Sequence, residues 1–120
     1  MPESKTYTGG CHCGAVYYEV TTDLVQVISC NCSICTKRGL LLTFVGEDKF
    51  TLLRGEAELT DYQFRTKQIH HLFCRHCGIE SFARGTAPGT DAPMVAVNLR
   101  CVEGVNLAGL SPKPFDGRSL

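Results

Sequence analysis

Hydrophobic and polar residues alternate over short distances along most of this chain, which is the pattern of half-buried β-strands. The clearest case is Met94–Arg100, where Val95, Val97 and Leu99 share one parity. Similar patterns predict strands at Ala15–Val20, Val25–Ser29, Leu40–Val45, Phe50–Arg54, Ala57–Phe64, Ile69–Phe73 and Ile79–Arg84. The sequence therefore predicts a mainly β protein with six to nine short strands.

Helical periodicity is almost absent, because no segment keeps a 3.6-residue repeat over several turns. One short turn is predicted over Ile34–Arg38, with Ser33 as its N-cap and Gly39 just after its end. The segment Gly85–Pro93 is rich in Gly, Pro, Thr and Ala and is predicted to be a surface loop. With 120 residues, the chain is expected to form one domain spanning residues 1–120.

Composition and charge narrow the classes of protein to which the chain can belong. Its 43% hydrophobic and 20% charged residues are ordinary for a globular domain and argue against disorder. The formal net charge is zero and positive residues run at most in pairs, so nucleic acid is not the expected partner. The sequence contains no apolar stretch of membrane-spanning length, and its polar N-terminus does not resemble a signal peptide. We therefore expect a cytoplasmic protein without a membrane partner.

Cysteine spacing is the strongest chemical feature of the chain. Seven of the eight cysteines form a C-x-C, a C-x-C-x-x-C and a C-x-x-C motif: Cys11 and Cys13; Cys30, Cys32 and Cys35; Cys74 and Cys77. In a reducing compartment such motifs indicate metal binding rather than disulfides. Zinc takes four protein ligands in structural sites, and three plus an open position in catalytic sites. The motifs thus predict a zinc protein.

Ligand counting favours two different zinc sites. The outer pairs supply a complete structural set: Cys11, Cys13, Cys74 and Cys77. The middle motif, Cys30, Cys32 and Cys35, would hold a second zinc with an open position. Two alternatives stay open. The middle and last motifs could share an ion, or a histidine could close the second site as its fourth ligand: His12, His70, His71 or His76.

Simpler roles are expected for the histidines and for the isolated cysteine. His12 and His76 lie between ligands, where side chains usually point away from the metal. Alternation sends His70 and His71 to opposite faces of a strand. Cys101 ends a β-branched strand and is expected to be a small buried hydrophobe.

The cysteine motifs and two later segments resemble the glutathione-dependent formaldehyde-activating enzyme family, also called the centromere-protein-V-like family. The matching segments are Gly9–Val16, Cys30–Cys35, Phe73–Gly78, Val97–Cys101 and Pro114–Arg118. The resemblance implies several small packed antiparallel sheets around structural zinc, a fold of the Mss4-like kind. It also implies structural zinc on the outer cysteines and labile zinc beside the substrate on the middle three.

The resemblance further implies carbon–sulfur lyase chemistry, in which formaldehyde and glutathione form S-hydroxymethylglutathione. We therefore expect an enzyme acting on a small thiol or thiol adduct, with Cys30, Cys32 and Cys35 as its catalytic zinc site. Glutathione carries two carboxylates, and the nearby cations that could bind them are Lys37, Arg38 and Arg75. Two other classes remain: a non-catalytic, zinc-stabilised binding module of the Mss4-like type, and a thiol redox or zinc-buffer protein.

Overall fold

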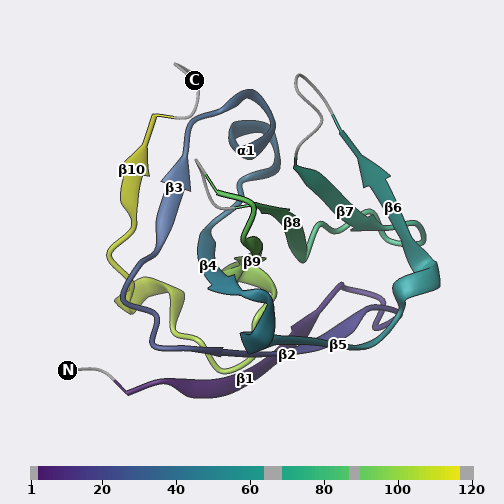
Figure 1. Ribbon diagram of the computed structural model, residues 1–120, viewed down its shortest axis with the longest axis horizontal. Helices are drawn as coiled ribbons and strands as arrows, with labels where there is room; N and C mark the ends of the chain where they lie inside the picture. Colours follow the sequence, from purple (N-terminus) through teal and green to yellow (C-terminus); the bar gives the residue numbers. More distant parts are fainter. Residues whose placement is uncertain (1–2, 64–68, 87–89, 117–120) are drawn as a thin grey trace.

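Two β-sheets make up most of the computed structural model, which describes residues 3–63, 69–86 and 90–116 (Figure 1). The smaller sheet has three strands in the order β1 (Lys5–Gly10), β2 (Tyr17–Thr22) and β5 (Phe50–Arg54). The larger sheet has seven strands in the order β10 (Lys113–Phe115), β3 (Ile28–Cys30), β4 (Leu42–Gly46), β9 (Pro93–Asn98), β8 (Phe82–Thr86), β7 (His70–Cys74) and β6 (Leu59–Tyr62). The expectation of a mainly β protein is confirmed.

Three aromatic rings join the two sheets in the core. Tyr18 of β2, Phe50 of β5 and Phe82 of β8 contact one another, with ring centroids 4.7 to 5.8 Å apart. The Tyr18 hydroxyl donates to the backbone oxygen of Ser81 at 3.2 Å, which satisfies its only buried polar group. Val95 and Val97 of β9 are fully buried beside these rings, as their shared parity predicts.

The short helix α1 (Ser33–Arg38) lies at the opposite end of the molecule from the smaller sheet (Figure 1). Gly39 ends it in the left-handed conformation at φ 63°, as predicted. The predicted N-cap, Ser33, is wrong by one residue. Cys32 is the N-cap, because its backbone is extended and its carbonyl accepts the first helical hydrogen bond, from Thr36 at 3.0 Å.

Several other short elements complete the fold. The described residues also form four 3₁₀ turns: η1 (Glu47–Lys49), η2 (Glu56–Glu58), η3 (Leu99–Cys101) and η4 (Leu107–Gly109). η3 begins where β9 ends, so the strand predicted to reach Arg100 is shorter than expected. None of the helices in the described residues has the length and hydrophobicity needed to span a bilayer.

The described residues contain ten strands, which is more than the sequence predicted. β1 was missed because KTYTGG is polar and glycine-rich, and β10 because it is three residues long and contains Pro114. β10 pairs with β3 in parallel, so the larger sheet is not wholly antiparallel. Of the predicted loop Gly85–Pro93, the first two residues belong to β8 and the last to β9. Residues 87–89 of that loop, and Phe64 of a predicted strand, lie outside the described residues.

One glycine is required where the smaller sheet meets the loop before β2. Gly55 has φ 97°, and a Cβ there would lie 2.3 Å from the carbonyl oxygen of Ala15. We predict that Gly55→Ala lowers the free energy of unfolding by about 2–4 kcal/mol, through left-handed strain and steric overlap. The control Gly104→Ala, at φ 79° with open space around it, should cost only about 1 kcal/mol. Urea unfolding at fixed zinc concentration measures both, and equal losses would contradict the close approach.

Candidate metal centres

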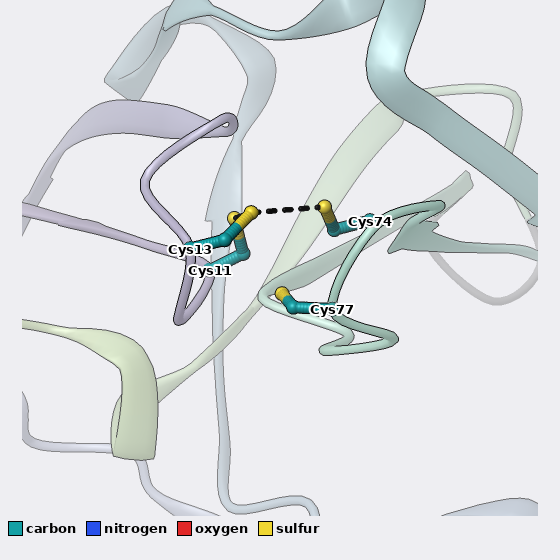
Figure 2. A group of neighbouring side chains, drawn as sticks. All are labelled: Cys11, Cys13, Cys74 and Cys77. Carbon is teal, nitrogen blue, oxygen red and sulfur yellow. Dashed lines mark hydrogen bonds between the residues drawn. The ribbon is translucent and has the colours of Figure 1, made fainter.

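The outer cysteine motifs converge at one point of the structure (Figure 2). Cys11 and Cys13 follow β1, whereas Cys74 ends β7 and Cys77 lies in the turn after it. The four sulfur atoms all lie within 4.8 Å of one another, and we call them the four-cysteine cluster. The sequence-predicted set is thus brought together.

The geometry of the four-cysteine cluster suits one zinc ion. Zinc–sulfur bonds of about 2.3 Å in a tetrahedron put the sulfurs about 3.8 Å apart. The Cys13 sulfur lies 3.6 Å from the sulfurs of both Cys11 and Cys74. The backbone N–H of Val16 donates to the Cys11 sulfur at 3.3 Å, and that of His76 donates to the Cys74 sulfur at 3.4 Å. Such donors stabilise thiolates, which are the form that binds metal.

The thiols of this cluster compete for negative charge. At Cys13 the backbone amide of Ala15 favours the thiolate, but desolvation and the neighbouring sulfurs, first that of Cys74, raise the pKa to about 12. At Cys77 desolvation opposes ionisation, but the backbone amide of Ile79 and the neighbouring cysteines lower the pKa to about 6. Four thiolates therefore need a cation among them, and binding that cation releases protons.

The middle motif forms a second group, which we call the three-cysteine cluster. Cys30 ends β3, Cys32 caps α1 and Cys35 lies within α1. Their sulfurs also lie within 4.8 Å of one another. Cys35 is buried, and the apolar side chains that pack around it are those of Ile34, Leu40 and Leu42. The three-cysteine cluster could also hold a metal ion.

Ionisation differs among these three thiols. Burial is the main cause that raises the pKa of Cys35, and it also raises the pKa of Cys30. Burial opposes ionisation of Cys32 as well, but backbone hydrogen bonds from Cys35 and Ile34 at the start of α1 lower its pKa. The N–H of Cys32 in turn donates to the Cys30 sulfur at 3.4 Å. The helix start thus favours a thiolate at its cap.

Among the described residues, no histidine or carboxylate completes the three-cysteine cluster. His70 contacts Asp61 at 2.6 Å, and His76 contacts Glu58 at 2.6 Å. His71 bonds to a different carboxylate, and His12 joins neither cluster. The residues outside the described ranges include no His, Cys, Asp or Glu. The alternative of a histidine as fourth ligand therefore has no support in this structure.

Two of the three predicted substrate cations already have anionic partners. Arg38 pairs with Glu80, and Arg75 Nε lies 2.7 Å from Glu58 Oε2. Lys37 is exposed on α1. Hydrogen bonds from His76 and Arg75 lower the pKa of Glu58, so the carboxylate beside the four-cysteine cluster stays charged. Glu80 was not singled out from the sequence. The one local signal was an acidic residue between Ile79 and Phe82, shortly after Cys77.

Cys101 lies outside both clusters, in η3. Its side chain is half-buried rather than fully buried, which differs slightly from expectation. Burial, followed by the nearby charges of Cys11 and Cys77, raises its pKa to about 11. A poorly ionised thiol with no cluster partner is the right control position for the metal ligands.

Comparison with known proteins gives the family. A family model described as glutathione-dependent formaldehyde-activating enzyme matches residues 6–113. The chain belongs to this family. A crystal structure of a Rhodobacter sphaeroides protein from structural genomics is similar, with a TM-score of 0.78 and 35% sequence identity. The match covers 89% of this chain and 97% of that chain. The resemblance inferred from the cysteine motifs is confirmed.

The four-cysteine cluster should be essential for stability. We predict that Cys77→Ala loses one bound zinc and lowers the free energy of unfolding by about 4 kcal/mol or more, because metal loss is among the largest single-site effects. Elemental analysis of purified protein and urea unfolding measure the two quantities. Cys101→Ala removes a thiol outside both clusters and should keep the wild-type zinc content. Full zinc content in Cys77→Ala would refute the assignment.

Proposed function

We propose that this protein is a zinc-dependent enzyme of the carbon–sulfur lyase type, acting on a small thiol or thiol adduct. The observation that carries the proposal is the difference between the clusters. One has four sulfurs, whereas the other has three and gains no fourth protein ligand from the described residues. Membership of a family described as glutathione-dependent supports a thiol substrate.

In this proposal the four-cysteine cluster holds a structural zinc ion and the three-cysteine cluster holds a labile one. Zinc bound by Cys30, Cys32 and Cys35 would supply a Lewis-acidic position open to a substrate thiolate or carbonyl oxygen. The chain's own residues set the surroundings. The strand end at Cys30 and the helix start at Cys32 fix two sulfurs, and Ile34 and Leu42 exclude water from the buried side.

Formaldehyde and glutathione are the first substrate pair to test. The glutathione sulfur would form a bond to the formaldehyde carbon, while the carbonyl oxygen takes the thiol proton and becomes a hydroxyl group. We place this reaction in the cytoplasm. All eight cysteines lie in the described residues and none forms a disulfide, which fits a reducing compartment where glutathione is present.

A triple variant, Cys30→Ala with Cys32→Ala and Cys35→Ala, separates the two clusters. We predict that it folds, keeps one of two zinc ions and loses the catalysed formation of S-hydroxymethylglutathione. Elemental analysis gives the zinc content, and NMR with ¹³C-formaldehyde and glutathione gives the rate above the spontaneous reaction. Cys101→Ala is the matched control and should retain both zinc ions and the rate.

Two outcomes would reject the proposed function. A triple variant with the wild-type rate would remove the three-cysteine cluster from the chemistry. A wild-type protein that binds two zinc ions but accelerates no thiol reaction would favour a zinc-stabilised binding module.

A further inference from the structure

The buried carboxylate of Glu80 pairs with the last residue of α1, the helix that contains Cys35 of the three-cysteine cluster. The Glu80 side chain is 1% exposed and that of His71 is 7% exposed. His71 Nδ1 donates to Glu80 Oε2 at 3.0 Å, and the other carboxylate oxygen, Oε1, accepts from Arg38. A charged group this deeply buried is costly unless both oxygens have partners. These three side chains, which we call the Glu80 triad, provide them.

The Glu80 triad connects two distant parts of the structure. Arg38 is the last residue of α1, one turn after Cys35. Its guanidinium carbon lies 5.2 Å from the ring centroid of Phe73 in β7 and 5.9 Å from that of Tyr62 in β6. The C-terminal end of α1 is therefore held by an ion pair to Glu80, which lies between β7 and β8, and by cation–π contacts to β6 and β7.

The sheet end of this connection is fixed. The Asn98 side-chain amide of β9 donates to the backbone oxygen of Glu80 at 3.0 Å. The Asn98 backbone N–H donates to the oxygen of Ser81 at 3.0 Å. His71 belongs to β7 and is paired with Ala83 of β8. The carboxylate thus occupies one defined position relative to the strands.

The helix end needs such support. A helix of six residues is too short to be stable by itself, so tertiary contacts set its position. Ile34 and Leu40 pack near the sulfurs, and Arg100 Nε donates to the Gly39 oxygen at 3.0 Å. Of these contacts to α1, only the Arg38–Glu80 contact is an ion pair, and the Glu80 side chain in it is buried. If Glu80 lost its charge, Arg38 would lose the ion pair that holds the C-terminal end of α1 in place.

We propose that Glu80, oriented by His71, is a positioning residue that sets the geometry of the three-cysteine cluster through Arg38. The inference rests on the proposed metal role of that cluster, and it does not depend on which thiol is the substrate. Groups that orient metal ligands from outside typically change metal affinity by about 10–100-fold when altered. Loss of the Glu80 charge should therefore change the affinity of the three-cysteine cluster for its metal ion.

The test compares two isosteric variants. Glu80→Gln removes the buried charge. The control Glu58→Gln makes the same change in a second arginine–carboxylate–histidine group, in which Glu58 contacts Arg75 and His76 beside the four-cysteine cluster. Zinc release to a colorimetric chelator should be about tenfold faster in the labile phase for Glu80→Gln. That phase should stay at the wild-type rate for Glu58→Gln.

Cobalt substitution adds a readout that a general loss of stability would not move. The visible absorption bands of Co²⁺ bound to sulfur report coordination geometry. We expect these bands to shift for the three-cysteine cluster in Glu80→Gln and not in Glu58→Gln. A folded Glu80→Gln protein with wild-type zinc release and wild-type cobalt bands would overturn the inference.

A double-mutant cycle tests whether Glu80 acts through Arg38. Arg38→Met keeps a long unbranched side chain at this position but removes the charge. If the two residues act together, the combined variant releases zinc no faster than either single variant. Additive effects would reject the route through Arg38. If Glu80→Gln does not fold, wild-type zinc release in Arg38→Met overturns the inference from the partly exposed end of the pair.

The outcomes separate this inference from the proposed function. Altered zinc release without any catalysed reaction in the wild type would reject the enzyme and keep the positioning role. Catalysis by the wild type, together with wild-type zinc release and cobalt bands in Glu80→Gln, would keep the enzyme and reject the positioning role. A wild-type protein whose three-cysteine cluster binds no metal would overturn both.

Discussion

The four-cysteine cluster brings together two segments that are about sixty residues apart, and the rest of the structure depends on this constraint. Cys11 and Cys13 follow β1 of the smaller sheet, whereas Cys74 ends β7 of the larger one and Cys77 lies in the turn after it. The two sheets are therefore joined at this cluster as well as through the aromatic core. The core of a domain of this size is small, so a metal ion at that point would stabilise how the sheets pack.

Each cysteine cluster is connected to a group of one arginine, one carboxylate and one histidine, and the two carboxylates differ in burial. The Glu58 group is partly exposed and adjoins a complete set of four ligands. In the Glu80 triad Glu80 and His71 are buried, and Arg38 belongs to the helix that contains Cys35 of the incomplete set of three. Exposed ion pairs contribute little to stability. A buried ion pair constrains geometry, because leaving one of its charges unpaired inside the protein costs several kcal/mol. The buried carboxylate, which requires its partners more strictly, is thus the one connected to the cluster proposed to react.

The sequence predicted features whose cause is local. Motif spacing marked the three groups of cysteines, and ligand counting favoured the grouping seen in the structure while leaving a second pairing open. Gly39 marked the end of α1 because glycine readily ends a helix at positive φ. β1 escaped prediction because its residues are polar, and its position depends on Gly9, where a Cβ would lie 2.5 Å from the Cys101 carbonyl oxygen. The Glu80 triad left no local pattern either, since its members come from three separate elements.

The wide separation of the outer cysteine motifs has a consequence for biosynthesis. All three residues of the three-cysteine cluster have been made once Cys35 is added, whereas the four-cysteine cluster lacks its last two ligands until Cys74 and Cys77 are translated. A growing chain could therefore bind a metal ion at this local cluster well before its long-range one exists. Zinc captured by the nearer thiols would bind before the strand that carries Cys74 has been translated.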